Sequence, residues 1–288
     1  MNNKYYQPTD LITALEIKSQ NSPSLVLAGG TDLVVEMRDS AKDISIMSLS
    51  KVKELKDISE NGHLIKIGAM VTFTEIAESS IIAQYAKAMG IAAASVGSPQ
   101  IRNRGTIGGS ICNANPAADI IPVLVCLEAV VSLLSIEGTI AKHRQLPIEQ
   151  FILGRHKTAL NDNEIVIGIE FAKMKPNAAI SFEKIGRRKA LAIARLNGAC
   201  LVEKSAGKIT KIVFSIGAAT AAPYCSEGLE ELFIDKDLDA KSLTAAGEMV
   251  VNQITALTGV RKSSIYKYPV IGKLTAKLIQ LAYNEAGE

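Results

Sequence analysis

Two pairs of adjacent glycines constrain this sequence more than any other feature. They lie in the segments Leu27-Ala28-Gly29-Gly30-Thr31-Asp32-Leu33 and Thr106-Ile107-Gly108-Gly109-Ser110. Adjacent glycines let the backbone turn sharply and leave its N–H groups accessible, because no Cβ atom covers them. Concave runs of N–H groups bind anionic oxygens, and a neighbouring hydroxyl adds one more donor. Two such turns predict a ligand with two phosphates that is held from both sides.

Each pair could also be an ordinary turn, which is the commonest use of adjacent glycines. The surroundings of the first pair favour binding. Residues 24–27 predict a short buried strand, and residues 32–38 have helical character with Asp32 at the place of a first-turn acid or helix cap. A strand, a glycine turn and a helix start form the arrangement in which phosphate binding recurs. Replacing Gly29 or Gly108 by valine is expected to remove the ligand and leave a folded protein.

The apolar pattern predicts an α+β chain. In the first part it predicts helices over residues 9–20, 74–79 and 81–95, a helix that starts at Pro116 or Asp119 and runs through Leu127, and strands over 25–27, 44–49, 63–68, 129–136 and 164–172. Residues 97–105 are expected to form no regular element. In the last part it predicts strands over 180–185, 194–204 and 209–218, followed by helices over 227–232, 242–257 and 267–286. We therefore predict a domain over 1–175, with subdomains about 1–52 and 53–175, and a C-terminal α+β domain over 178–288 with an antiparallel three-stranded sheet plus helices.

Composition and charge exclude several classes of protein. The net charge of +3, without a dense Lys/Arg tract, gives no reason to expect nucleic-acid binding. No stretch approaches the ~20 uninterrupted apolar residues of a membrane span. The first residues lack the apolar centre of a signal peptide, so we expect a cytoplasmic protein.

The sequence offers neither a metal site nor a set of catalytic residues. The four cysteines form no C-x-x-C pair, and the three histidines are scattered, so we predict neither a zinc site nor an iron–sulfur cluster on this chain. The signatures of Rossmann dinucleotide sites, P-loops and zincins are absent. We expect the cysteines to be buried free thiols.

Taken together, three segments resemble the FAD-binding medium subunit of molybdenum hydroxylases, the family of xanthine, nicotinate and carbon monoxide dehydrogenases. These are the two glycine segments, the second extended back to Val96, and Asn115-Pro116-Ala117-Ala118-Asp119. The resemblance implies an FAD-binding fold of the p-cresol methylhydroxylase (PCMH) type, in two subdomains, with a C-terminal domain. Both glycine turns would wrap the FAD pyrophosphate.

The same resemblance assigns further residues. Asp119 would hydrogen-bond the flavin end of FAD, and Lys184 would lie near its ring system. Val96, Val166 and Ile193 would line the adenine or the isoalloxazine. From the residues alone, Asp119 could equally cap the following helix, Lys184 could be a solvated lysine, and the three apolar residues could be ordinary core. The roles of Arg102 and Arg104 stay open.

The resemblance also implies a function. The chain would be the electron-transfer subunit of a heteromeric oxidoreductase that hydroxylates an N-heteroaromatic, purine-like or nicotinate-like substrate. The molybdenum cofactor would lie on a large molybdopterin-binding subunit, and two 2Fe–2S clusters on a small ferredoxin-like subunit. Electrons would leave FAD for an external acceptor. An alternative is a free-standing PCMH-type flavoprotein oxidase or reductase.

The identity of the acceptor is not fixed. Family members that reduce NAD often carry acidic residues where this chain has the basic and apolar segment from Lys189 to Ile193. This argues against NAD. It leaves NADP, whose extra phosphate would suit Arg187, Arg188 or Lys189, as well as a quinone or a protein carrier.

Overall fold

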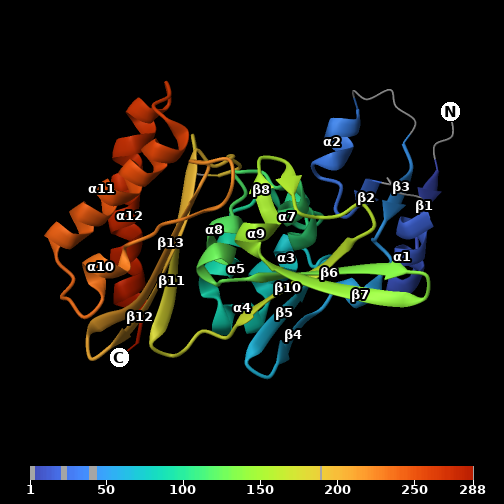
Figure 1. Ribbon diagram of the computed structural model, residues 1–288, viewed down its shortest axis with the longest axis horizontal. Coiled ribbons are helices and arrows are strands. Elements are labelled where there is room, and N and C mark those ends of the chain that lie inside the picture. Colours follow the sequence, from blue (N-terminus) through green and yellow to red (C-terminus); the bar gives the residue numbers. More distant parts are fainter. Residues whose placement is uncertain (1–3, 21–24, 39–43, 189, 288) are drawn as a thin grey trace.

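The computed structural model describes residues 4–20, 25–38, 44–188 and 190–287. Ser24 and Lys189, which the sequence analysis included, lie outside these ranges. The three larger sheets follow one another along the molecule, with the N-terminal sheet at one end and the C-terminal helices at the other (Figure 1), and β8 and β9 form a further two-stranded sheet.

The N-terminal sheet is a small parallel β-α-β unit. Its strands have the order β1-β3-β2, and both outer strands pair in parallel with β3. The elements are β1 (Tyr5–Tyr6), α1 (Leu11–Gln20), β2 (Leu25–Leu27), α2 (Leu33–Met37) and β3 (Ile46–Ser48). Ala14 and Leu15 of α1 are fully buried in a core shared with Met47 of β3. The first glycine turn therefore leaves the carboxyl end of β2, the edge of such units where ligands bind.

The middle sheet is antiparallel, with the order β4-β5-β10-β6-β7. Its strands are β4 (Ile58–Asn61), β5 (Leu64–Gly68), β6 (Val130–Glu137), β7 (Ile140–Pro147) and β10 (Ile165–Ala172). Between and beside them lie η1 (Lys53–Leu55), α3 (Phe73–Glu78), α4 (Ser80–Tyr85), α5 (Lys87–Ala94), α6 (Pro99–Arg102), α7 (Ile107–Asn113), α8 (Ile121–Cys126), α9 (Ile148–Phe151), β8 (Ile152–Gly154) and β9 (Lys157–Thr158).

The C-terminal sheet contains the three long antiparallel strands that the sequence predicts. They are β11 (Ala178–Ile185), β12 (Leu196–Ser205) and β13 (Lys208–Gly217), and a two-residue strand, β14 (Tyr224–Cys225), pairs with β13. The helices that follow are α10 (Glu230–Phe233), α11 (Ala240–Thr258) and α12 (Ser264–Glu285). Helix α12 contacts β11 and β12, while α5 and α8 contact this sheet too, so helices of the middle part reach it (Figure 1).

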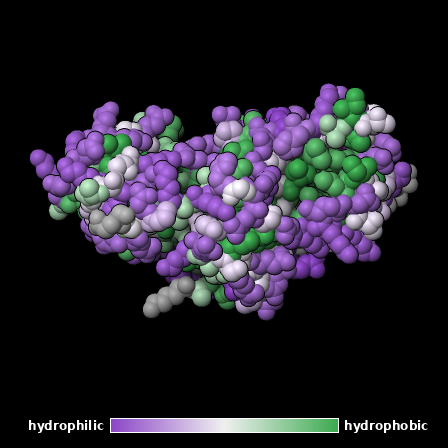
Figure 2. Space-filling view, turned by 90° about the horizontal axis from the view of Figure 1, so that it is seen from below, coloured by the Kyte–Doolittle hydropathy of each residue, from purple (hydrophilic) through white to green (hydrophobic). Residues whose placement is uncertain are grey.

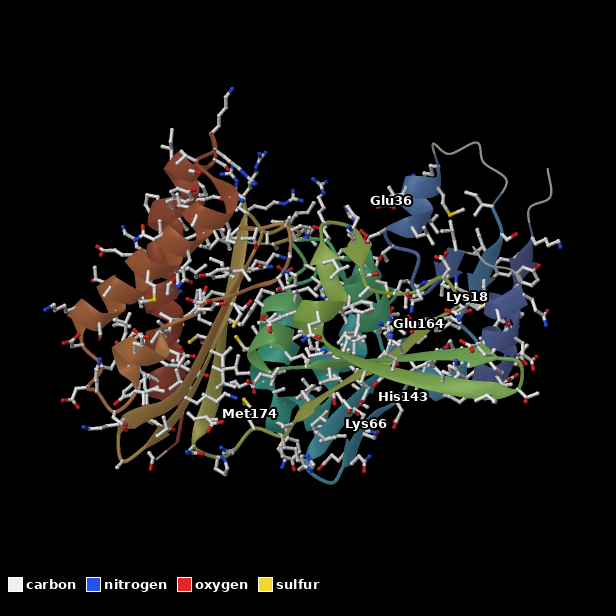
Figure 3. The ribbon with its side chains drawn as sticks, in the orientation of Figure 1. Lys18, Glu36, Lys66, His143, Glu164 and Met174 are labelled. Atoms are coloured by element: carbon white, nitrogen blue, oxygen red, sulfur yellow. The ribbon has the colours of Figure 1, made fainter. Side chains whose placement is uncertain are left out.

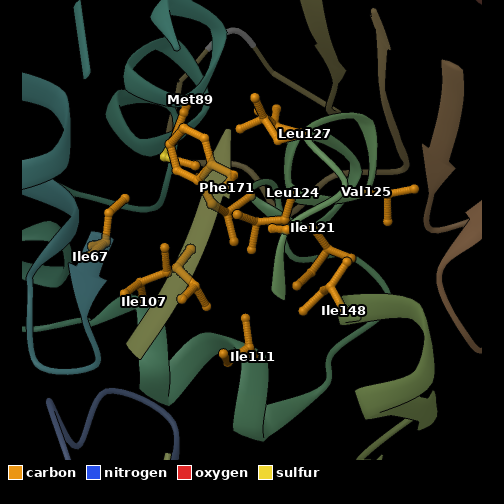
Figure 4. Close-up of a cluster of buried hydrophobic side chains, with 14 of the residues drawn as sticks. Ile67, Met89, Ile107, Ile111, Ile121, Leu124, Val125, Leu127, Ile148 and Phe171 are labelled. Atoms are coloured by element: carbon orange, nitrogen blue, oxygen red, sulfur yellow. The ribbon is translucent and has the colours of Figure 1, made fainter. Parts of the chain in front are cut away.

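The largest hydrophobic core joins the middle and C-terminal parts. Phe171 of β10 packs there with Leu124 and Ile121 of α8 (Figure 4). The same core includes Ile180 and Leu201 from the C-terminal sheet. This confirms the predicted α+β class, whereas the domain boundaries at 175 and 178 stay a prediction.

The structure differs from the sequence prediction at several places, among them helix α7, which was not predicted, and α8, which begins at Ile121. The helix expected over 81–95 is interrupted at Ala86, which has φ −154° and ψ 51°. The segment 97–105 contains the short helix α6, because Ser98 caps it and Pro99 occupies its first position. Strands β4 and β7 were not expected, since β7 is mostly exposed and lacks a buried face. Within the described ranges, no helix is long and apolar enough to cross a membrane.

Candidate FAD site

The two glycine turns meet in one cleft of about 570 Å³. A Cβ atom placed on Gly29 would lie only 1.9 Å from the carbonyl oxygen of Arg104. The first turn therefore rests directly on the backbone that leads into the second. A Cβ atom on Gly109 would lie 3.5 Å from that of Ala28, so the turns also touch at their tips. Glycine is required where two backbones approach this closely.

The first turn presents free backbone donors to the cleft. The N–H groups of residues 28–32 donate to no other group among the residues that the structure describes. Gly30 has φ +75°, a left-handed conformation that glycine adopts readily. Asp32 occupies the N-cap position of α2, but its side chain accepts no capping hydrogen bond. This unsatisfied row of N–H groups suits an anionic oxygen.

The backbone donors of the second turn are largely used within the fold. The N–H groups of Ile107 and Gly108 donate to the carbonyl oxygens of Val71 and Ala69 at 3.0 and 2.9 Å. The N–H group of Gly109 donates to the hydroxyl of Thr106 at 3.1 Å, which caps α7. Because these donors are used within the fold, this turn anchors α7 beside the first turn and presents no row of free N–H groups.

The structure brings together most of the residues that the sequence singled out. Those that line the cleft are Ala28, Gly29, Gly30, Thr31, Asp32, Leu33, Val96, Thr106, Gly109, Ser110, Asp119, Lys184 and Ile193. Gly108 and Val166 line an adjoining apolar pocket of about 230 Å³, to which Ala28 and Gly109 also contribute. Leu27 and Ile107 line neither, because Leu27 pairs with Ser48 in the N-terminal sheet and Ile107 is fully buried in the core.

A buried ion pair stands at the other end of the cleft. The Lys184 ammonium lies 2.5 Å from one carboxylate oxygen of Asp119 and donates to the Ser95 carbonyl at 2.9 Å. The Asn197 amide donates to the other oxygen of Asp119 at 2.9 Å. Burial raises the pKa of Asp119, and the hydrogen bonds from Lys184 and Asn197 oppose that rise. The N-cap of α8 is Ile120, so Asp119 is not the helix cap that it could have been.

Comparison with known proteins identifies the kind of chain. The family described as "FAD binding domain in molybdopterin dehydrogenase" matches residues 1–173. The chain belongs to this family. The family described as "CO dehydrogenase flavoprotein C-terminal domain" matches residues 181–282 of this FAD-binding chain.

Relatives of this FAD-binding chain carry consistent names. The nicotinate dehydrogenase FAD-subunit of Eubacterium barkeri is 31% identical over 282 residues, which cover 96% of this chain and 94% of the relative. The xanthine dehydrogenase FAD-binding subunit of Escherichia coli O157:H7 is 28% identical over 287 residues, which cover 98% of this chain and 97% of the relative. A carbon monoxide dehydrogenase structure from Hydrogenophaga pseudoflava aligns with TM-score 0.91 at 24% identity, over 100% of this chain and 99% of that one, and so shares the fold.

The residues present fit FAD. The cofactor has a diphosphate between an adenosine end and a flavin end, so it needs donors in the middle and space on both sides. The turn with the free N–H groups of residues 28–32 lines the same cleft as Asp119 and Lys184, and Ala28 also lines the apolar pocket at Val166.

Charged groups border the apolar pocket of this FAD-binding chain. Lys18 is buried, and burial lowers its pKa despite the charge of Asp162. Glu164 accepts two hydrogen bonds from the guanidinium of Arg144, at 2.8 and 2.7 Å. Figure 3 shows Lys18 and Glu164 on the side of the middle sheet that faces α1, with Glu36 above them on α2. Glu36 lines the cleft.

Sequence reasoning missed some residues of the cleft. His156 lines it, with Nδ1 2.8 Å from the carbonyl oxygen of Asn113, although the scattered histidines gave no signal of this. Phe73 also lines the cleft. It was missed because the sequence of its helix, α3, resembles that of any capped helix. Arg102, whose role was open, donates to the carbonyls of Val96 and Gly97 and thus holds its own loop.

The described residues contain no cluster of three or more histidine, cysteine or acidic side chains that could hold a metal ion. Cys112 lies at the cleft, and burial raises its pKa to about 12. Its thiol is therefore protonated near neutral pH, as expected for a cysteine that is not a nucleophile.

Proposed function

We propose that this chain holds FAD in the cleft and serves as the electron-transfer subunit of a heteromeric molybdenum hydroxylase. Bound FAD supplies the redox chemistry, taking electrons from 2Fe–2S clusters and giving them to an external acceptor. The supporting observation is the row of free N–H groups at residues 28–32, in a cleft that the Asp119–Lys184 ion pair also lines and that adjoins an apolar pocket. The protein then contributes binding, orientation and electrostatics.

We assign a role to each part of the site. The N–H groups of the first turn and the hydroxyl of Ser110 would hold the diphosphate. Val166 would pack against the adenine in the apolar pocket. Asp119 and Lys184 would lie at the flavin end, where Val96 and Ile193 would cover its apolar surface. Ile193 is 81% exposed, which leaves a large apolar side chain available at the mouth of the cleft.

The other centres of such an enzyme would lie on partners. The relatives are named as FAD subunits or medium chains, and no metal-binding cluster occurs in the part of the chain that the structure describes. We therefore propose a large subunit with the molybdenum cofactor and a small ferredoxin-like subunit with two 2Fe–2S clusters. Figure 2 shows an apolar area on the lower face of the molecule, toward the N-terminal sheet. Such an exposed area fits burial against a partner subunit.

The substrate and the acceptor are finer proposals. Because relatives are named nicotinate and xanthine dehydrogenases, we propose hydroxylation of an N-heteroaromatic compound, by a xanthine- or nicotinate-type dehydrogenase in the cytoplasm. The Arg188 guanidinium donates to the carbonyl oxygen of Leu191. This hydrogen bonding within its own loop weakens the case for Arg188 as a partner of the NADP phosphate.

One pair of variants tests the cofactor site. Thr31→Asp places a carboxylate beside the free N–H groups, where it repels a diphosphate; Ser205→Asp adds the same charge in the exposed hairpin between β12 and β13. We expect purified Ser205→Asp to keep the flavin absorbance of the unchanged chain and Thr31→Asp to lose most of it. Equal flavin content in both variants would refute the assignment.

Co-purification tests the assembly. The proposed function requires that the tagged chain bring down a large molybdenum-containing chain and a small iron–sulfur chain. A flavin-loaded chain that purifies alone and oxidises a substrate by itself would instead establish the alternative, a free-standing flavoprotein oxidase or reductase. His156 at the cleft would then be the first candidate for a proton donor.

A further inference from the structure

A second cavity, of about 220 Å³, lies behind the loop that borders the FAD cleft. Pro116 lines this cavity, whereas its neighbours Asn115 and Ala117 line the cleft. Every charged residue that lines the cavity is a cation: Arg155 from the turn between β8 and β9, Arg261 from the α11–α12 connection, and Lys267 from α12.

These three cations are not neutralised by the protein. Arg155, Arg261 and Lys267 form no ion pair with any described residue, although eight lysines and arginines elsewhere do. The nearby Arg195 adds positive charge, with its guanidinium 4.8 Å from the centre of the Tyr266 ring. Burial and the charges of Arg261 and Arg195 lower the pKa of Lys267. Like charges gathered around a concave wall raise the local concentration of anions.

Two of the cations are each fixed by one hydrogen bond to a backbone carbonyl. The Lys267 ammonium donates to the Ala218 carbonyl at 2.5 Å, which leaves its other N–H bonds unassigned. Arg261 donates through Nε to the Thr258 carbonyl at 3.2 Å, so its two terminal nitrogens stay available. Ser263 lines the same wall, as does Thr220, whose hydroxyl donates to the Ala222 carbonyl at 2.7 Å. Arginine forks and ammonium groups are the side chains that bind phosphate oxygens.

We propose that this cavity binds a phosphate dianion, either as inorganic phosphate or as the phosphate monoester of a nucleotide. The cavity is much smaller than the FAD cleft, so it suits one phosphate group and not a whole dinucleotide. The site shares no charged residue with the cleft. It therefore goes beyond the proposed function and does not depend on it.

Calorimetric titration of the full-length chain tests the proposal. Inorganic phosphate and 2′,5′-ADP are titrated separately at low ionic strength, because salt screens such contacts. We expect saturable binding of at least one probe at a single site. Each of Arg261→Gln and Lys267→Gln should weaken it about tenfold or more, as for a lost charge-assisted hydrogen bond. Lys262→Gln, adjacent in sequence but not part of the cavity wall, should bind as the unchanged chain does.

The outcomes distinguish the two sources of the phosphate group and show when the proposal fails. Tighter binding of inorganic phosphate supports a free ion, and tighter binding of 2′,5′-ADP, with competition by phosphate, supports a nucleotide. Arg155→Gln, on another loop, replaces Lys267→Gln if far-UV circular dichroism shows that variant unfolded. The absence of saturable binding of both probes, or equal affinity in folded cavity variants and Lys262→Gln, overturns the proposal. Flavin content is measured in parallel and should not change.

Discussion

Replacing Gly29 by alanine should destabilise the whole chain, and not merely weaken cofactor binding. The added Cβ atom would lie 1.9 Å from the Arg104 carbonyl oxygen, whereas ordinary contacts begin at 3.4 Å. The two turns must therefore separate by about 1.5 Å (3.4 − 1.9), and both partners are backbone. Overpacking of this kind costs about 3 kcal/mol or more. For a chain of this size, that lowers the unfolding temperature by about 6–12 °C.

The measurement is thermal unfolding followed by far-UV circular dichroism, since the chain has no tryptophan. The control is Gly154→Ala, which adds the same methyl group where no atom lies within 4 Å and should leave the unfolding temperature unchanged. An unchanged unfolding temperature in Gly29→Ala would refute the close approach of the two turns. Gly108 has a similar constraint, because its Cβ atom would lie 2.6 Å from the Ala69 carbonyl oxygen. The expectation that valine at either glycine leaves the fold intact is therefore wrong on structural grounds.

Two further predictions concern buried charge. Asp119→Asn and Lys184→Met each remove the counter-ion of the remaining charge, so each should lower the free energy of unfolding by about 3 kcal/mol. In urea unfolding, the double variant should lose clearly less stability than the sum of the two single variants. Additive losses would contradict the coupling of the two side chains. Burial raises the pKa of Glu164, but hydrogen bonds from Arg144 and Asn161 outweigh it, so the pKa lies below its ordinary value of 4.5. The folded state thus favours the carboxylate of Glu164, and the stability that it contributes is present above about pH 4.5 and is lost as the pH falls through the lowered pKa. On acidification, the unfolding temperature of Glu164→Gln should therefore fall less than that of the unchanged chain. Parallel curves of unfolding temperature against pH would show that Glu164 does not contribute.

Much of the fold could be predicted because local patterns and tertiary packing agree. Helices α1, α11 and α12 and strands β11 to β13 begin and end within a few residues of their predicted positions. Strand β7 could not be predicted. None of its eight residues, from Ile140 to Pro147, is buried. Backbone pairing with β6, and not a buried face, therefore holds this strand in the sheet.

The sequence indicated which residues meet at the cleft, but it did not indicate their hydrogen bonds. Glycine at 108 indicated a close approach correctly, but the neighbour proved to be the Ala69 backbone. A sequence shows that a backbone position needs glycine without showing whether a ligand or another segment comes close. The position of His156 at the cleft could not be predicted for a related reason. It depends on contacts with Asn113, which is far away in the sequence.

The two glycine turns therefore differ in their hydrogen bonding, although the sequence predicted the same role for both. Thr106 caps α7 and uses the N–H group of Gly109, so the second turn is fixed before any ligand arrives. The first turn packs on it through Gly29 and leaves the donors of residues 28–32 unsatisfied. A donor row held rigid by a neighbouring helix start loses little conformational entropy when an anion binds. If the first turn holds the diphosphate as proposed, the second glycine pair would contribute to its affinity by keeping the first turn rigid.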